Sequence, residues 1–185
     1  MRVTPLALLA LACAGCASAP EQPLREYLDE QTAATIKVVA EPWIFTRERT
    51  HERSDERDYL NVYAIDVNRM GDHRQYLAVL QSSPLRDAAG KDTPPPTLQL
   101  KTGGEELLLE PARENPRELG VAQPVAQSYT YESRWWYYSV DRPTLARIAH
   151  ARDVEVSLAA GDARAAYVLW RDGSAEAAAL SSAIP

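Results

Sequence analysis

The chain has 185 residues, a formal net charge of −6 and 25% charged residues, a length that suits one domain with a substantial core. The acidic balance argues against a nucleic-acid-binding surface, which needs clustered Lys and Arg, and no apolar run reaches the roughly 20 residues that span a bilayer. Both cysteines, Cys13 and Cys16, lie near the N-terminus, so the rest of the chain has no thiol for catalysis, a disulfide or a metal site.

The N-terminus has the layout of a secretory signal. Arg2 is followed by the apolar run of residues 6–12, and small residues precede Cys16. This order resembles the signal peptide of bacterial (Gram-negative) lipoproteins, whose lipobox reads Leu, then Ala or Ser, then Gly or Ala, then Cys. Residues 14–16 match that motif, and Cys13 stands where leucine is usual.

The resemblance implies that Cys16 becomes the mature N-terminus and carries a diacylglycerol and an N-acyl chain such as palmitate. Several acyl chains hold a protein stably at a membrane. The next residue is Ala17 and not Asp, which in these lipoproteins implies sorting to the outer membrane, with the domain on its periplasmic face. Two alternatives stay open: cleavage before Cys13, and an ordinary cleaved signal that releases a soluble periplasmic protein.

We therefore expect a signal peptide over residues 1–15, a lipid-anchored tether over residues 16–30 and a single β-rich periplasmic domain over residues 31–185. The tether is small, polar and Pro-rich at its start. Its residues 24–28 have the apolar spacing of one helical face, which allows a short helical turn before the domain.

The first half of the domain predicts strands. Residues 35–46 form a strand that breaks near Pro42, because proline cannot donate to a sheet ladder. Residues 47–58 contain charges of both signs and are expected as a solvated hairpin connection, the alternative being an ion- or partner-binding loop. Two further hairpins are predicted from alternating apolar segments separated by glycine: residues 59–67 with 75–81, and residues 97–100 with 105–110.

Residues 127–140 give the strongest strand signal, because aromatic residues follow one another without Gly or Pro. Trp135 and Tyr137 share one face of this strand, and Arg134 lies on the other. These three are the candidate binding residues, since aromatic side chains and arginine are the preferred anchors of binding surfaces. The alternative is a packed core, for which Trp136 is the first candidate.

The C-terminal part predicts a helix that opens at residues 141–143 with Pro in its first turn, then strands at residues 154–158 and 164–170. Ser174 is expected to cap a short Ala-rich helix over residues 175–180. The fold class is mainly β (α+β): an antiparallel, β-sandwich-like domain of about eight strands, with a helix after the aromatic strand and a short C-terminal helix.

Few residues suggest chemistry. His51, His73 and His150 do not pair at metal-ligand spacing. Asp153 and Glu155 share a strand face at a separation that could suit glycoside hydrolysis, although acids that alternate with valines are typical of a solvent-facing strand. We therefore assign no cofactor, no metal ligand and no catalytic residue.

The sequence thus predicts a non-enzymatic binding or envelope-assembly accessory at the outer membrane. The expected partners are the membrane, through the lipid anchor, and an envelope protein or glycan whose identity stays open; nucleic acid is not expected. Two alternatives are an envelope hydrolase that acts on glycan or peptide, and a glycan- or peptide-binding module that uses the aromatic strand.

Overall fold

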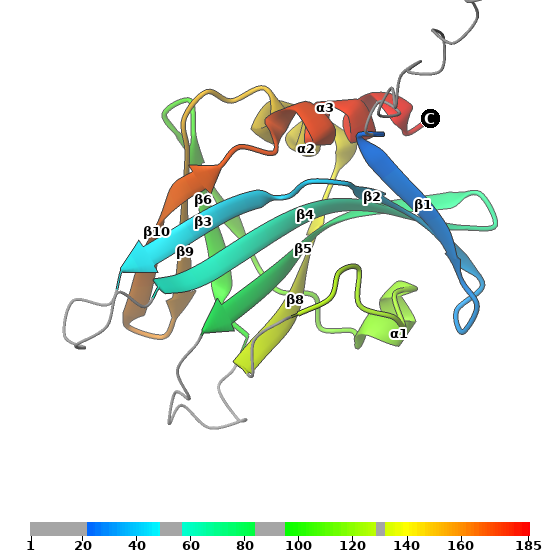
Figure 1. The fold of residues 1–185 in the computed structure, drawn as a ribbon, viewed down its shortest axis with the longest axis horizontal. Helices are drawn as coiled ribbons and strands as arrows, with labels where there is room; N and C mark the ends of the chain where they lie inside the picture. The colour runs from blue at the N-terminus through cyan, green and yellow to red at the C-terminus, as the bar shows by residue number, and fades with distance from the viewer. Residues whose placement is uncertain (1–21, 49–56, 84–94, 129–131) are drawn as a thin grey trace, which may run out of the picture.

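The computed structural model describes residues 22–48, 57–83, 95–128 and 132–185 (Figure 1). The expected signal peptide, the candidate anchor Cys16 and His51 lie outside the described residues. The start of the expected aromatic strand is likewise only partly covered, because residues 129–131 are not described.

Antiparallel strands make up most of this fold. Within the described residues they are β1 (Leu24–Asp29), β2 (Ala34–Val39), β3 (Trp43–Glu48), β4 (Arg57–Arg69), β5 (Asp72–Ser83), β6 (Thr97–Thr102), β7 (Glu105–Leu109), β8 (Glu132–Val140), β9 (Val154–Ala160) and β10 (Ala163–Arg171). The helices are α1 (Pro116–Leu119), α2 (Arg142–Ala149) and α3 (Ser174–Ala183). The mainly β, sandwich-like prediction with its two C-terminal helices is confirmed, and the described part has ten strands where about eight were expected.

Two strands are additional, because the segment predicted over residues 35–46 forms both β2 and β3, and because residues 24–29 form β1. The helical turn allowed at residues 24–28 is therefore wrong. All six residues of β1 pair antiparallel with β2, from Leu24 opposite Val39 to Asp29 opposite Ala34. An apolar spacing this short does not distinguish helix from strand, and pairing with a neighbouring strand decides between them. The sheet therefore begins before residue 31, within the segment expected as tether.

The sheet divides at β4, its longest strand. On one edge, the first half of β4 pairs with β3 and the second half with β2. These are the two halves of the strand predicted over residues 35–46, separated as expected around Pro42. From β3 the sheet continues through β10, β9 and β6 to β7, whereas from β2 it ends at β1. The other edge of β4 pairs along its length with β5, which in turn pairs with β8.

The sheet folds over so that β7 approaches β8. The backbone N–H of Ala112 donates to the carbonyl of Tyr137 at 2.7 Å, and Pro111 forms an isolated bridge with Tyr138. Two side-chain bonds cross the enclosed core: the Tyr138 hydroxyl donates to the carbonyl of Pro96 at 2.8 Å, and the Gln81 amide donates to the Tyr167 hydroxyl at 3.0 Å. One hydrophobic core therefore lies between the two layers of a single sheet.

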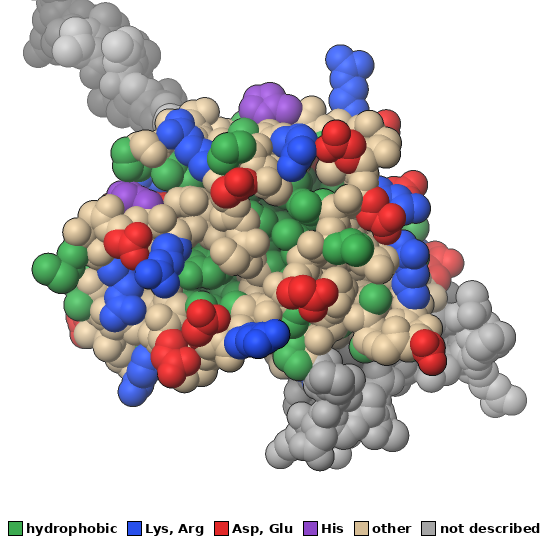
Figure 2. All heavy atoms as spheres, turned by 180° about the vertical axis from the view of Figure 1, so that it is seen from behind, with side chains coloured by type: hydrophobic (Ala, Val, Ile, Leu, Met, Phe, Trp, Pro, Cys, Tyr) green, Lys and Arg blue, Asp and Glu red, His purple; other side chains and the backbone are tan. Residues whose placement is uncertain are grey.

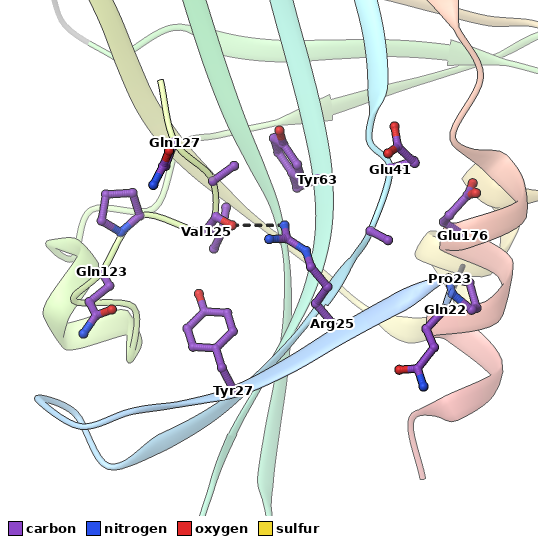
Figure 3. A pocket seen from close by; sticks show the side chains of 13 residues that line it. Gln22, Pro23, Arg25, Tyr27, Glu41, Tyr63, Gln123, Val125, Gln127 and Glu176 are labelled. Atoms are coloured by element: carbon purple, nitrogen blue, oxygen red, sulfur yellow. Dashed lines mark hydrogen bonds between the residues drawn. The ribbon is translucent and has the colours of Figure 1, made fainter. Parts of the chain in front are cut away.

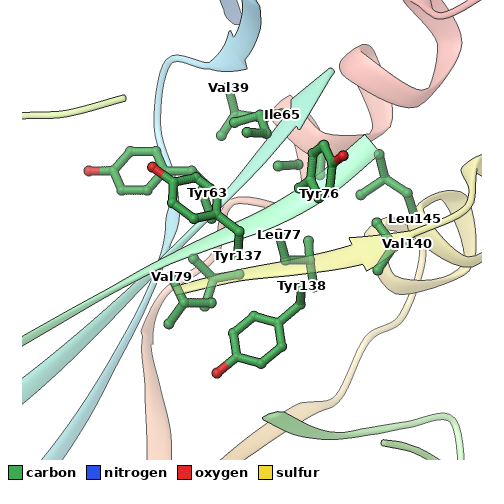
Figure 4. Close-up of a cluster of buried hydrophobic side chains, with 14 of the residues drawn as sticks. Val39, Tyr63, Ile65, Tyr76, Leu77, Val79, Tyr137, Tyr138, Val140 and Leu145 are labelled. Atoms are coloured by element: carbon green, nitrogen blue, oxygen red, sulfur yellow. The ribbon is translucent and has the colours of Figure 1, made fainter. Parts of the chain in front are cut away.

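Strand β8 is covered on both of its faces, as predicted for the aromatic strand. Tyr137 is 5% exposed on one face and Tyr138 is fully buried on the other (Figure 4). Trp135 and Trp136 are only half-buried, so the core aromatics of this strand are the two tyrosines, and the expectation that Trp136 belongs to the core is wrong.

Helices α2 and α3 lie together at one end of the folded sheet (Figure 1). The predicted opening of α2 is confirmed, because the Asp141 carboxylate accepts the backbone N–H of Thr144 at 2.8 Å. Ser174 does not cap α3: its backbone N–H donates to Asp172, and the N-cap position is Gly173. A Cβ at Gly173 would lie 2.6 Å from the backbone nitrogen of Trp43, so this close approach of the chain requires glycine.

Candidate functional site

The candidate site is a pocket of about 730 Å³ at the β1 end of the sheet (Figure 3). Directly opposed residues of paired strands share a face, so Arg25 and Tyr27 of β1 lie on the same face as Ile65 of β4 and its neighbour Tyr63. We call this the pocket face. The pocket is lined by Gln22, Pro23, Arg25, Tyr27, Ala40, Glu41, Tyr63, Gln123, Pro124, Val125, Ala126, Gln127 and Glu176.

Residues 120–127 form one wall of the pocket and are held in place by polar side chains of β1 and the turn after it. Asp29, which is fully buried, accepts the backbone N–H groups of Ala122 at 2.7 Å and of Gln123 at 3.0 Å. The Thr32 hydroxyl donates to the carbonyl of Gly120 at 2.9 Å, and this glycine has φ 95°, a conformation that favours residues without a Cβ.

The carboxyl group of Asp29 is ionised in this setting because of its donors. Burial by itself would raise the pKa of Asp29, but the backbone N–H groups of Gln123, Ala122, Gln31 and Thr32 outweigh that effect and hold the pKa below its ordinary value. Asp29 is thus a fixed negative charge that orients the loop at residues 120–127. Its carboxylate oxygens are occupied by hydrogen bonds from four backbone N–H groups.

Three charged side chains reach the pocket itself. The guanidinium of Arg25 donates to the carbonyl of Val125 at 3.3 Å and has no ion pair with any described residue. Glu41 is paired with Arg171. Glu176, half-buried at the start of α3, has no hydrogen bond or ion pair within the described part of the chain.

Figure 3 shows how these charges are arranged. The Arg25 guanidinium is directed towards Val125 and Tyr63, whereas the carboxylates of Glu41 and Glu176 lie on the opposite side of Arg25. The lining is thus positive towards the 120–127 wall and negative towards α3. A cation and an anion that lack ion-pair partners in the described part of the chain therefore line one pocket.

Aromatic rings extend from the lining residue Tyr63 along the pocket face. The ring centroids of Tyr63 and Trp135 are 5.8 Å apart, and those of Trp135 and Tyr137 are 6.4 Å apart with nearly parallel planes. The Tyr27 hydroxyl is buried and has no hydrogen-bond partner among the described residues. Its burial, followed by the nearby Asp29 charge, raises the pKa of Tyr27, so Tyr27 stays a neutral hydroxyl.

The structure brings two of the three predicted binding residues together. Trp135 and Tyr137 lie on the pocket face, where Trp135 contacts the lining residue Tyr63. Arg134 pairs with Gln81 on the opposite face of the sheet, so it does not reach this pocket. Tyr137 is nearly inaccessible, and burial raises its pKa; its position supports the ring of Trp135.

The charged lining residues Arg25 and Glu176, and the β1 residues beside Arg25, were not predicted as site residues from the sequence. Arg25, Tyr27 and Asp29 alternate along β1, which is the signal of one strand face, but this segment was assigned to the tether. Glu176 lies in the first turn of α3, and no local sequence pattern identifies it as a site residue. Only the fold places it near β1.

The remaining candidates lie elsewhere. His73 contacts the buried Asp66 at 2.8 Å, and His150 contacts the carbonyl of Ala146 at 2.7 Å. Within the described residues no group of three His, Cys, Asp or Glu side chains could hold a metal ion. Asp153 and Glu155 are exposed and line a smaller hollow of about 480 Å³ over β9 and β10.

The face shown in Figure 2 carries acidic and basic side chains interspersed, with hydrophobic side chains visible between them. Ion pairs connect some of the exposed charges of the described residues, such as Arg147 with Glu105 at 3.1 Å. Exposed pairs of this kind contribute little to stability.

No family model matches this chain, and no curated protein or solved structure matches it either. None of the helices in the described ranges has the length and apolar character needed to cross a membrane.

Proposed function

We propose that this chain is a lipoprotein anchored in the outer membrane through Cys16, and that its periplasm-facing β domain binds an envelope ligand in the pocket beside β1. The observation that supports binding is the pair of charges in that pocket. Arg25 and Glu176 lack ion-pair partners among the described residues, and such groups gain most when a ligand completes their hydrogen bonds.

Binding is favoured over catalysis because of what lines the pocket. Its described residues contain no His, Cys or Ser, so a hydroxyl or thiol nucleophile activated by histidine is missing from them. Amides, tyrosines, one arginine and two glutamates instead provide hydrogen bonds, charge and apolar contact, which is the composition of a recognition site. The wall at residues 120–127 is fixed before any ligand arrives, and a preformed pocket lowers the entropic cost of binding.

The test is a thermal-shift panel on the full chain, with short glycans, peptides and lipid headgroup analogues as probes. A ligand present at 100 times its Kd stabilises the folded state by about 2.7 kcal/mol, which raises the Tm of a domain this size by roughly 5–10 °C. We expect at least one probe to act on the wild type and not on Arg25→Ala.

Arg113→Ala is the matched control, because Arg113 is exposed and lies outside the pocket lining. It should respond as the wild type does. If every stabilising probe acts equally on Arg25→Ala, the pocket is not the binding site. If a probe is instead cleaved, the hydrolase alternative replaces this proposal.

A further inference from the structure

We infer that the ligand of this pocket is a zwitterionic phospholipid headgroup of the phosphoethanolamine class, a step that rests on the proposed function and names its ligand. The first argument is charge. Glu41 is already compensated by Arg171, so among the described residues the pocket lining leaves Arg25 as a cation and Glu176 as an anion without an ion-pair partner.

A ligand with a single charge would satisfy only one of these two groups. An anion bound to Arg25 would leave the half-buried Glu176 without a partner. An uncharged sugar that covered the exposed Arg25 would displace its hydration without pairing either charge, which is costly. A ligand that carries an anion and an ammonium group can pair with both. The charge pattern therefore favours a zwitterion.

The two ends of the pocket also differ in chemistry. The planar guanidinium of Arg25 suits an oxyanion such as a phosphate. Glu176 can accept hydrogen bonds from an ammonium group, while the amides of Gln22 and Gln123, which line the pocket, add uncharged donors and acceptors. The phosphate is thus assigned to the Arg25 side and the ammonium group to the side of α3.

The second argument is the position of the pocket along the chain. Gln22 and Pro23 line it, and only six residue steps separate Gln22 from Cys16. Fully extended, such a segment spans at most about 20 Å. The headgroup region on each side of a bilayer is roughly 5–7 Å deep, so an anchor at Cys16 keeps the pocket within a short distance of lipid headgroups.

The experiment uses the full chain in an uncharged glycoside detergent and titrates it with four probes. These are dihexanoyl phosphatidylethanolamine, dihexanoyl phosphatidylglycerol, soluble glycerophosphoethanolamine and a neutral dipeptide. We expect the phosphatidylethanolamine to bind at least about tenfold more tightly than the phosphatidylglycerol, because each charge-assisted hydrogen bond is worth about a factor of ten.

Arg25→Ala and Glu176→Gln should each weaken phosphatidylethanolamine binding about tenfold, whereas the exposed controls Arg113→Ala and Glu114→Gln should not change it. Equal affinity for the phosphatidylethanolamine and the phosphatidylglycerol would contradict the assignment of a zwitterionic ligand. Glycerophosphoethanolamine carries the same headgroup and should bind about as tightly as the lipid. Equal affinity for the dipeptide overturns the phosphoethanolamine class, and binding of glycerophosphoethanolamine without binding of the lipid overturns the lipid source.

The proposed function can be judged separately. If a glycan or peptide probe binds in a way that depends on Arg25 while the lipid does not, pocket binding stands and the headgroup assignment is wrong. If Arg25→Ala and Glu176→Gln bind every probe as the wild type does, the proposed binding in this pocket and the headgroup assignment are both wrong.

Discussion

Asp29 connects the first strand to the loop that closes the pocket. Its carboxylate accepts the backbone N–H groups of Ala122 and Gln123. These two residues follow Asp29 in the sequence by 93 and 94 positions. Buried carboxylates that accept several N–H bonds stay ionised, because the donors offset the lost hydration. One side chain therefore fixes the position of a wall that local sequence could not position.

Asp29→Asn should lower the free energy of unfolding by about 1–3 kcal/mol at neutral pH, because an amide cannot accept all the bonds that the carboxylate accepts. The pKa of Asp29 is lowered in the folded state, so its contribution is present above the unfolded pKa and is lost as the pH falls through the folded pKa. The gap between wild type and variant should therefore shrink as the pH falls from about 5 towards 2. Urea denaturation across that range measures it.

The exposed Asp153 provides the control, since Asp153→Asn should change stability by less than about 0.5 kcal/mol. A gap between wild type and Asp29→Asn that stays constant with pH would contradict the assignment of a buried, ionised carboxylate.

At the scale of elements, β8 shows why adjacent aromatics have different roles. Tyr138 lies in the enclosed core and donates to the carbonyl of Pro96. Trp135 lies on the pocket face and remains half-buried beside Tyr63. The alternation of the strand assigned them to opposite faces in advance, but the depth of burial depends on which segments cover each face.

Tyr138→Ala should cost about 3–5 kcal/mol, as for other fully buried aromatic residues. Trp135→Ala should cost less, about 1–2 kcal/mol, because its ring is only partly removed from water. Urea midpoints of the two variants give the order directly. Tyr138→Phe, which removes only the hydroxyl bond, should cost about 1 kcal/mol. A larger loss for Trp135→Ala than for Tyr138→Ala would mean that the pocket face, and not the enclosed core, supports β8.

Local signals account for the elements that the sequence predicted. The break around Pro42, the glycine turn between β6 and β7, and the Asp141 cap each depend on a few neighbouring residues. The strand β1 could not be recognised in this way, because its partner is what makes it a strand. The pocket depends on contacts such as Arg25 with Val125, 100 positions apart, and no local pattern encodes them.

For the whole molecule, the anchor and the pocket meet in one short stretch of sequence. Strand β1 starts at Leu24, and the pocket includes the two residues before it. A lipid attached at Cys16 would therefore restrain the pocket more closely than any other part of the described surface, because the connecting segment is so short. The position of the anchor thus bears directly on which ligands the pocket can meet.

Cys16→Ser should abolish labelling of the protein by a clickable palmitate analogue and move it from the membrane to the soluble fraction, because the acyl chains supply the membrane affinity. Cys13→Ser is the matched control and should leave both unchanged. Ala17→Asp should keep the protein in the inner membrane if sorting follows the lipoprotein pattern.

Labelling that persists in Cys16→Ser and is lost only in Cys13→Ser would move the anchor three residues further from Gln22 and extend the reach of the tether to about 30 Å. If neither the wild type nor Cys13→Ser is labelled, the chain is a soluble periplasmic protein. The pocket would then have no reason to select a ligand from the membrane surface.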